Sequence, residues 1–404
     1  MRSLTDAPFF NPLDPAFQAD PLPVYAQLRE QSSVVQTPVG AGVVRRDAAQ
    51  QLLTDSRVTT ALVMMSRAQG LTEGPVAELI GATVLALDGE DHARVRRLVA
   101  RSFTPKAADR HRPLMRELVN ELVDGFASDG HCEFVTQFAD QFPIQVICEV
   151  LGVPRERHAD FARWGSDSTY VLSLNLSAHL NEVIESASAV IDYIDDLINE
   201  RRASPRDDLV TGLIQASEDG DVLSQLELRA MIGGLGFAGY DTTRNQLGRA
   251  MFLFAQNPDQ WDLLGDNPDL AAGAVNEVMR VAGVIDGVPR SATADIEVDG
   301  WLIPAGTFVF LSMASANHDA EVYDDASEFD ITRRAAPNLT FGAGPHFCLG
   351  ANLARAEMEE ALQILATRLP HIRLDDVPTW RSDTGIFGPA LMPLAFDPAP
   401  QHLE

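Results

Sequence analysis

The stretch Phe341-Gly342-Ala343-Gly344-Pro345-His346-Phe347-Cys348-Leu349-Gly350 decides how the rest of this chain is interpreted. Its three glycines and its proline predict a tight turn, because only glycine lets backbone amides approach one point so closely. The apolar periodicity of residues 349–369 predicts a helix that stops at Pro370. Cys348 is therefore expected at a helix N-terminus, where the dipole and unpaired amides stabilise a thiolate. Such a thiolate can be a metal ligand or a nucleophile.

An inert, buried cysteine is the more common fate of a single Cys beside a glycine turn. This loop, however, resembles the haem-binding loop of the cytochrome P450 superfamily at six positions, namely Phe341, Gly342, Gly344, His346, Cys348 and Gly350. The resemblance implies that Cys348 ligates the iron of haem b. It also implies that His346 binds a haem propionate and that Gly350 borders the cofactor.

The resemblance covers nearly the whole chain of 404 residues. Length alone suggests two or three domains. The resemblance instead implies one domain, residues 1–404, with the mainly α fold and small β-sheets of the cytochrome P450 family.

Composition narrows the partners and the compartment. A net charge of −27 argues against nucleic acid and anionic membrane surfaces, since both would repel the chain. No run of 18 apolar residues and no leader-like start is visible, so we expect a cytoplasmic protein without membrane contact. Three cysteines (Cys132, Cys148 and Cys348) cannot form a disulfide framework or a four-cysteine iron–sulfur site, so electrons must come from another protein.

The N-terminal third contains three local signals. Pro21 after Asp20 predicts a short helix that ends near Glu30, and two β-branched runs around residues 38–40 predict a hairpin. The residues from Ala61 to Leu87 are apolar but poorly periodic, which suggests a mobile loop over a pocket or ordinary core packing.

Residues 91–113 carry seven cationic side chains and only two acids within an acidic chain. His92 and Arg96 share a helix face because they are four residues apart, and the resemblance assigns this pair to a haem propionate. Arg94, Arg97 and Arg101 point elsewhere, and they suggest a docking surface for an acidic electron donor of the ferredoxin type. Intramolecular ion pairs are the competing interpretation.

A capping box, Ser224-Gln225-Leu226-Glu227, predicts a long helix that ends at Gln256. Four glycines between residues 233 and 239 destabilise its middle by about 1 kcal/mol each, which suggests that something bulky approaches the backbone. The stretch Ala238-Gly239-Tyr240-Asp241-Thr242-Thr243 resembles the family's oxygen-activation motif. The resemblance implies that Ala238 and Gly239 border the haem, that Thr242 donates a hydrogen bond to dioxygen and that Asp241 relays protons.

Further resemblances follow in the family's order. Glu277 and Arg280 are three residues apart on one predicted helix and imply a structural ion pair, while Arg290 implies a further residue that binds a haem propionate. His318 stands where the family commonly has Arg, which leaves the local salt bridge there undetermined. Asp299-Gly300 between two short apolar runs predicts a second hairpin.

The resemblance implies a monooxygenase that inserts one oxygen atom into a hydrophobic small molecule. Its pocket candidates are Met64, Val84, Ala238, Ile285 and Phe387. A peroxide-using or non-oxygenating haem-thiolate enzyme is an alternative, and so is a non-catalytic recruitment module of the same fold. The Asp241-Thr242 pair argues against the first alternative, and the presence of Cys348 argues against the second.

Overall fold

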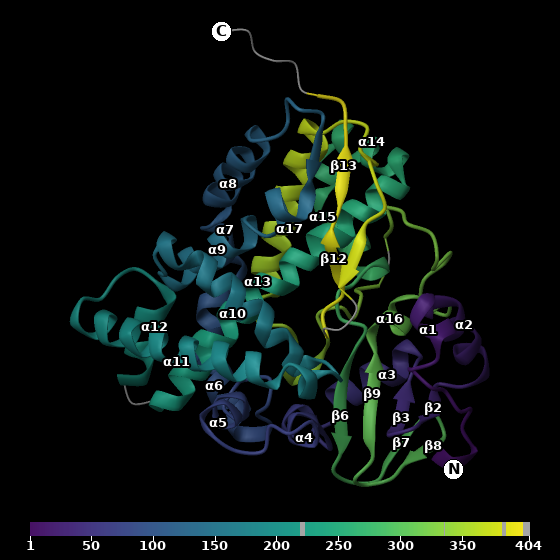
Figure 1. Cartoon of the computed structure of the whole chain (residues 1–404). Coiled ribbons are helices and arrows are strands. Elements are labelled where there is room, and N and C mark those ends of the chain that lie inside the picture. The colour runs from purple at the N-terminus through teal and green to yellow at the C-terminus, as the bar shows by residue number, and fades with distance from the viewer. Residues whose placement is uncertain (219–222, 335, 382–384, 399–404) are drawn as a thin grey trace, which may run out of the picture. The chain divides into compact units, whose positions relative to one another are not determined.

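The computed structural model describes residues 1–218, 223–334, 336–381 and 385–398 (Figure 1). These residues fall into two compact units. Unit 1 contains Met1–Met64 and Asn276–Cys348, and unit 2 contains Met65–Val275 and the chain from Leu349 onward. Each unit therefore combines two separated segments of sequence. The prediction of a mainly α fold with small β-sheets is confirmed.

Unit 1 is built on a five-stranded sheet with the order β2-β3-β9-β6-β4. Its strands are β2 (Val34–Thr37), β3 (Gly40–Val43), β9 (Phe308–Ser312), β6 (Gly287–Ala292) and β4 (Val58–Thr60). The predicted hairpin is confirmed as the antiparallel pair β2 and β3, and β3 pairs in parallel with β9. Gly40 permits this pairing, since a Cβ there would lie 2.1 Å from the carbonyl oxygen of Phe308.

A three-stranded sheet, β1-β8-β7, completes the β structure of unit 1. It contains β1 (Arg2–Ser3), β7 (Ile296–Val298) and β8 (Trp301–Ile303). The predicted Asp299-Gly300 turn joins β7 to β8, and both turn residues have positive φ angles of 47° and 74°. These are the left-handed conformations that a tight two-residue hairpin turn requires.

The helices of unit 1 pack around these sheets, and its core unites the sheets with α3 (Arg46–Thr54). The other helices include α1 (Pro15–Ala19), α2 (Pro21–Gln31) and α16 (Met313–Asn317). The prediction of a helix beginning at Pro21 is confirmed, but the side chain of Asp20 makes no capping hydrogen bond.

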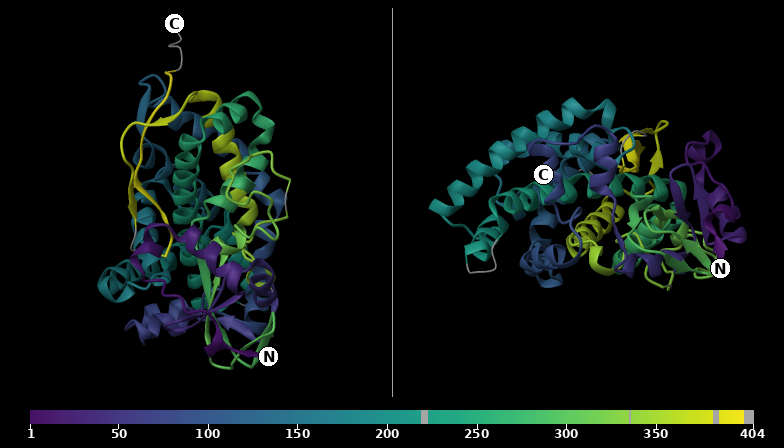
Figure 2. Two further views of the ribbon diagram at one scale, coloured as in Figure 1. Left: turned by 90° about the vertical axis from the view of Figure 1, so that its right-hand side faces the viewer. Right: turned by 90° about the horizontal axis from the view of Figure 1, so that it is seen from below.

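Unit 2 is organised around the 32-residue helix α13 (Gln225–Gln256), against which many other helices pack (Figure 2). The capping box is confirmed in both directions, since Ser224 accepts from the Glu227 amide and the Glu227 carboxylate accepts from the Ser224 amide. Helices in contact with α13 are α5 (Pro75–Gly81), α9 (Phe142–Leu151), α10 (His158–Ser168), α11 (Leu180–Ala203), α12 (Leu209–Glu218), α14 (Pro258–Asp266) and α17 (Ala351–Arg368). Further helices are α6 (Gly89–Ala100), α7 (Pro105–Asp109) and α8 (Arg112–Asp124).

Two small sheets belong to unit 2. One has the order β10-β13-β5, from Arg373–Leu374, Pro393–Ala395 and His131–Glu133, and the other pairs β11 (Thr379–Arg381) with β12 (Gly388–Leu391). A π-helical turn, Val135–Ala139, follows β5.

The prediction of a loop from Ala61 to Leu87 is wrong, because this segment contains α4 (Leu62–Ala68) and α5. Both helices are only seven residues long. A segment that short completes too few turns for a periodic apolar stripe to be visible.

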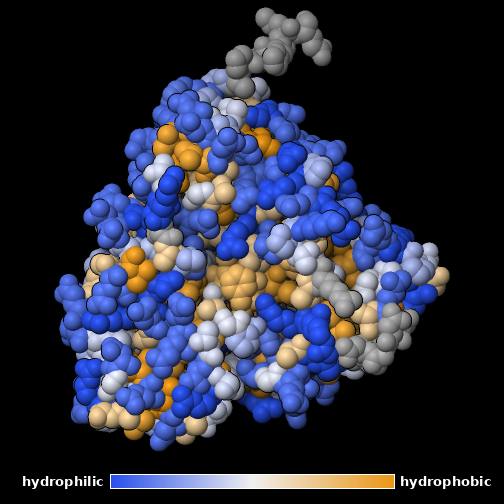
Figure 3. Space-filling view, turned by 180° about the vertical axis from the view of Figure 1, so that it is seen from behind, coloured by the Kyte–Doolittle hydropathy of each residue, from blue (hydrophilic) through white to orange (hydrophobic). Residues whose placement is uncertain are grey.

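The surface in Figure 3 is mostly hydrophilic, with the hydrophobic residues in separate clusters. Among the described residues, no helix combines the length and hydrophobicity needed to cross a membrane.

Candidate active site

The cysteine loop closes through its own backbone. Gly342 and Gly344 have φ angles of 70° and 67°, and the Cys348 amide donates to the Phe341 carbonyl at 2.8 Å. A Cβ on Gly344 would lie 2.5 Å from the Leu53 carbonyl oxygen, so this glycine is required by both its φ angle and its surroundings. The loop therefore holds Cys348 at a defined position, as its glycine pattern predicts.

The helix after the loop begins later than predicted. Its first residue is Ala351, with Gly350 as the N-cap, so Cys348 precedes the helix by three residues. Gly350 has a φ angle of −82° and makes no side-chain capping hydrogen bond, so no capping residue marks this boundary in the sequence.

Four further residues that were predicted for the site belong to unit 1, and three of them are partly accessible. His346 belongs to the short 3-10 helix Gly344–His346, and Ile285 lies in the connection before β6. Arg290 lies on β6, opposite Val309 of β9 and Thr60 of β4. The fourth, Met64, is exposed.

In unit 2, His92 and Arg96 occupy successive turns of α6, as their spacing predicts. His92 is 3% exposed, whereas Arg96 is partly accessible. A buried imidazole and a half-buried guanidinium on one helix face form a suitable anion-binding pair.

The cationic segment around α6 is partly neutralised within unit 2. Arg94 forms an ion pair with Glu227 of the capping box, and Arg112 bonds to Asp109, Glu359 and Glu360. Intramolecular pairing, the competing interpretation, is thus correct for these two arginines. Arg97 is exposed, and the side chain of Arg101 lies outside the described residues.

The middle of α13 has a partly accessible strip. Gly234, Ala238 and Thr242 follow one another at four-residue spacing and are all partly accessible, whereas Asp241 is completely buried. The Thr242 hydroxyl donates to the Ala238 carbonyl oxygen at 2.7 Å. In this conformation the hydroxyl presents lone pairs and can accept a hydrogen bond, and the predicted donation to dioxygen requires its hydrogen to leave Ala238.

One glycine of α13 is explained by packing within the protein. A Cβ on Gly239 would lie 2.7 Å from the Ile147 side chain of α9, whereas one on Gly236 would make only an ordinary contact, 3.4 Å from Phe161 of α10. At Gly239 the bulky group beside the backbone is thus a packed protein side chain. A role of Gly239 beside the haem stays a prediction.

Asp241 lies in a polar cluster. Arg381 of β11 donates to one carboxylate oxygen at 2.9 Å, and Asn245 donates to the other at 3.0 Å. Burial raises the pKa of the Asp241 carboxyl, while Arg381 and Arg244 lower it. Burial is the larger effect, so the pKa of Asp241 lies above its ordinary value even though two cations are near.

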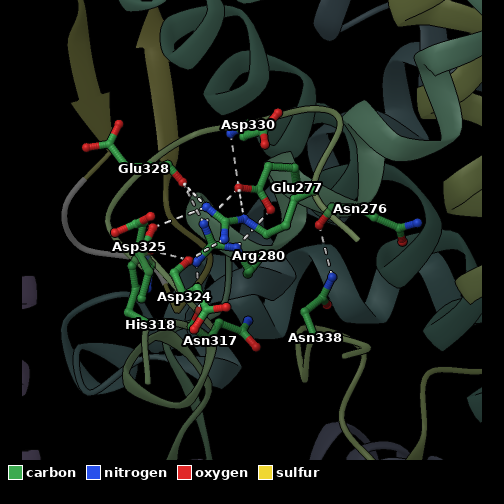
Figure 4. A network of polar contacts seen from close by, with 12 residues as sticks. Asn276, Glu277, Arg280, Asn317, His318, Asp324, Asp325, Glu328, Asp330 and Asn338 are labelled. Atoms are coloured by element: carbon green, nitrogen blue, oxygen red, sulfur yellow. Dashed lines mark hydrogen bonds and ion pairs between the residues drawn. The ribbon is translucent and has the colours of Figure 1, made fainter. Parts of the chain in front are cut away.

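The pair of Glu277 and Arg280 is confirmed as a buried ion pair on α15 (Ala271–Val281) (Figure 4). Two nitrogens of Arg280 donate to the two Glu277 oxygens, each at 2.8 Å. Arg280 also donates to the carbonyls of Asn317, Ala326 and Glu328. All of these hydrogen bonds join residues of unit 1, so the ion pair holds the loops of that unit in place.

His318 replaces the arginine expected at its position and is buried near Arg280 (Figure 4). Its Nδ1 lies 2.9 Å from the Ala314 carbonyl oxygen, which identifies the tautomer with a hydrogen on Nδ1. Burial lowers the pKa of His318 to about 4, and Arg280 and Arg29 contribute to this shift. A neutral imidazole thus occupies this position.

The remaining pocket candidates are in unit 2. Val84 lies in the turn before α6, Ala238 in the accessible strip of α13, and Phe387 beside β12, and all three are partly accessible. A pocket role for them stays a prediction.

Sequence reasoning missed the partners of Asp241. Arg381 is 140 residues from Asp241, and no pattern in the sequence connects them. Arg244 and Asn245 lie three and four residues after Asp241, so helical spacing could have placed them beside it.

Comparison with known proteins extends over nearly the whole chain. The family model described as Cytochrome P450 matches residues 78–264 and 266–383. Luteothin monooxygenase of Streptomyces thioluteus is 39% identical over 400 residues, with 98% of each chain covered. Mycinamicin IV hydroxylase/epoxidase of Micromonospora griseorubida is 37% identical over 383 residues, with 92% of this chain and 94% of the relative covered.

Solved structures agree with this similarity. CalO2 matches with a TM-score of 0.90 and 29% identity, covering 96% of this chain and 99% of that structure. Epothilone D-bound cytochrome P450epoK matches with a TM-score of 0.88 and 28% identity, covering 96% and 99%. The similarity thus includes both units.

Proposed function

The chain belongs to the cytochrome P450 family, and we propose that it binds haem b through Cys348 and inserts one oxygen atom of dioxygen into a hydrophobic small molecule. Its relatives are named monooxygenases and hydroxylases, so the chain is an oxidoreductase with a haem cofactor. We further propose that residues 1–404 act as one functional domain.

The single observation that supports Cys348 as the ligand is its accessibility among the three cysteines. Cys132 and Cys148 are buried, and burial raises the pKa of each thiol to about 12, so both remain protonated. Cys348 is partly accessible in a loop held by two left-handed glycines. A single thiolate with histidines and arginines at other positions fits a haem with anionic propionates.

Other residues would hold the cofactor, some by charge and others by contact with the ring. We propose that His92, Arg96, Arg290 and His346 bind the propionates, and that Ala238, Gly239 and Gly350 border the ring. When bound, the haem iron would supply dioxygen activation, and the thiolate would increase electron density on the iron.

Thr242 and Asp241 would handle the proton. The Thr242 hydroxyl donates a hydrogen bond to the Ala238 carbonyl oxygen. At the accessible strip of α13 it would accept a hydrogen bond and pass a proton on. We propose that Asp241 relays protons, because burial raises the pKa of its carboxyl above the ordinary value and so makes protonation easier than for an exposed aspartate, although Arg381 and Arg244 oppose this shift.

The substrate would be largely apolar, because the pocket candidates Met64, Val84, Ala238, Ile285 and Phe387 are mostly hydrophobic. Relatives are named for luteothin, mycinamicin IV and vitamin D(3), which differ from one another, so these names do not select one molecule.

An acidic ferredoxin-type protein would supply the electrons. Arg97 is exposed and is the best candidate for its docking contact, with Arg94 and Arg101 nearby in sequence. Raising the ionic strength should then slow reduction of the enzyme by a ferredoxin, because salt screens such charges.

The deciding experiment is the absorption spectrum of the reduced protein under carbon monoxide, for wild type, Cys348→Ala and the control Cys132→Ala. We expect a strongly red-shifted Soret band in wild type and Cys132→Ala and its loss in Cys348→Ala. A wild type without haem would instead favour the recruitment module. If the wild type shows the red-shifted Soret band but converts a substrate only with peroxide, and not with dioxygen and a ferredoxin, the peroxide-using alternative is favoured.

A further inference from the structure

The connection between α10 and α11, residues 169–179, is fastened to the end of α4 by one side chain. The Gln69 amide donates through Nε2 to the Ser173 carbonyl oxygen at 2.9 Å, and it accepts through Oε1 from the Leu176 backbone amide at 2.9 Å. Both ends of the side-chain amide are therefore used on the same turn. All three residues belong to unit 2.

The backbone at Gln69 is itself fixed. Gln69 directly follows the last residue of α4, and Gly70 after it has a φ angle of 103°. The Leu71 amide donates to the Ser66 carbonyl at 3.0 Å. The Gly70 amide donates to the Arg67 carbonyl at 3.1 Å. These two bonds and the left-handed glycine form a Schellman motif, so the Gln69 side chain starts from a defined position.

The turn that Gln69 binds is closed to water. Leu176 is completely buried, and Ser173 is 6% exposed. The Ser173 hydroxyl is already used, since it donates to the Tyr170 carbonyl at 2.9 Å and accepts from the Asn175 amide at 3.0 Å. Without Gln69, a buried N–H and a buried carbonyl oxygen would each lose this partner, which is unfavourable for the turn in its present position.

Two further contacts hold the connection. The rings of Tyr170 and His179 stack with 3.7 Å between their centroids and 7° between their planes, which joins the two ends of the connection. A Cβ on Gly385 would lie 2.5 Å from the Leu172 carbonyl oxygen, so the segment before β12 packs on the backbone of the connection. Phe387, a pocket candidate, lies in that segment. The connection is therefore also held by its own ends and by the segment that contains Phe387.

Both partners in this link lead to the accessible strip of α13. A Cβ on Gly234 of the strip would lie 3.9 Å from the methyl group of Thr83, which follows α5. A Cβ on Gly165 of α10 would lie 3.2 Å from the ring of Tyr240, a neighbour of Asp241 in sequence. The chain that follows α4 and the helix α10 thus both reach the part of α13 for which we propose oxygen chemistry.

We infer that Gln69 is a positioning residue that limits the size of the substrate, because it holds the connection between α10 and α11 to the end of α4. This inference rests on the proposed function. A molecule that fits beside the strip with both hydrogen bonds made binds without breaking them. A larger molecule requires residues 173–176 to leave Gln69, so its affinity is reduced by the small fraction of protein in that released state.

Two substitutions of Gln69 separate its two hydrogen bonds. Gln69→Met has a side chain of similar length that makes neither bond. Gln69→Glu keeps an acceptor for the Leu176 amide but, as a carboxylate, has no donor for the Ser173 carbonyl. Hydrogen exchange of the Leu176 amide, followed by mass spectrometry, reports how often the turn is released, and it requires no enzymatic activity.

The control is Gln225→Met. Gln225 also joins two elements of unit 2, since its Nε2 donates to Asp195 of α11 at 3.1 Å, and Asp195 keeps Arg229 as a partner in this variant. We expect the Leu176 amide to exchange about 10–100-fold faster in Gln69→Met, because its N–H then has no acceptor in the closed turn. The rate in Gln69→Glu should lie between those of the wild type and Gln69→Met, and Gln225→Met should exchange like the wild type.

The second measurement uses the haem-loaded proteins and two ligands of the haem iron, imidazole and clotrimazole, an imidazole that carries a bulky triphenylmethyl group. Their binding is followed by the shift of the Soret band, without turnover. The Kd of clotrimazole should fall in Gln69→Met by the same factor by which exchange rises, because both report the population of the released state. The Kd of imidazole should stay unchanged.

The inference is overturned if the Leu176 amide of Gln69→Met exchanges as in the wild type. It is also overturned if both ligands gain affinity by the same factor, since a general loosening does not select by size. A Gln69→Met protein that does not fold is recognised by circular dichroism, and Gln69→Glu then carries both comparisons. Should the wild type lack the thiolate spectrum, the proposed function fails, but the exchange measurement still decides whether Gln69 fastens the turn.

Discussion

Replacement of the buried His318 should remove most of one pH-dependent component of stability. The folded protein holds this imidazole neutral with a pKa of about 4, whereas an unfolded chain has the ordinary value of 6.5. Between these two values the unfolded state binds more protons, so the free energy of unfolding falls as the pH falls. At about 1.4 kcal/mol for each pKa unit, the loss between pH 7 and pH 4 is about 3 kcal/mol.

His318→Asn keeps a donor for the Ala314 carbonyl but cannot titrate. We therefore expect its free energy of unfolding to lie below the wild-type value at pH 7.5 and to approach or exceed it at pH 4.5. Urea unfolding followed by far-UV circular dichroism at a series of pH values measures this difference.

His371 provides a control of opposite sign. It is exposed and 2.8 Å from Asp397, whose hydrogen bond raises the pKa of the imidazole. Its contribution is complete below the unfolded pKa and is lost as the pH rises through the folded value, so His371→Asn should lose stability on the acidic side. Parallel pH curves for wild type and His318→Asn would refute the neutral assignment of His318.

Two packing predictions concern other buried positions. Glu277→Gln leaves the Arg280 and Arg333 guanidiniums without their shared carboxylate, so it should lower the free energy of unfolding by about 3–5 kcal/mol. Asp195→Asn, at a partly exposed ion pair, is the control and should lower it by at most about 1 kcal/mol. Equal losses in urea unfolding would contradict this reasoning. Gly239→Ala should lower the free energy of unfolding by about 1–3 kcal/mol, because the added Cβ collides with Ile147. Gly212→Ala is the control: it has open space around it and should raise the free energy of unfolding by up to about 1 kcal/mol. If adding Ile147→Ala to Gly239→Ala does not restore stability, the collision is not the cause of the loss.

Local patterns in the sequence predicted the fold where a few adjacent residues determine the backbone. The glycine turn before Cys348, the capping box at Ser224 and the Asp299-Gly300 hairpin each depend on residues within one short stretch of sequence, and the structure confirms all three. The parallel pairing of β3 with β9 has no such local signal, because it joins strands more than 260 residues apart. Only the packed core of unit 1 selects that pairing.

In the candidate site, too, local relations could be predicted from the sequence and long-range ones could not. The spacing of His92 and Arg96 is sufficient to place them on one face of α6, whereas the role of Cys348, which is partly accessible, stays a prediction. The ion pair of Arg94 with Glu227 joins residues 133 positions apart and could not be predicted from charge counts. A count records how many cations are present, but partners distant in the sequence decide which of them remain available.

Among the buried carboxylates of the described residues, Glu277 and Asp241 differ in the number of hydrogen bonds that they accept. Glu277 accepts four hydrogen bonds, two from Arg280 and one each from Arg333 and the Asp330 amide. Asp241 accepts two on its carboxylate oxygens, one from Arg381 and one from Asn245. Protonating a carboxylate removes favourable interactions with each donor, so Glu277 would lose the more extensive set. Of these two carboxylates, Asp241 would lose fewer interactions on protonation, and this supports the proposal that it, next to Thr242 in sequence, gains and loses a proton in each reaction cycle.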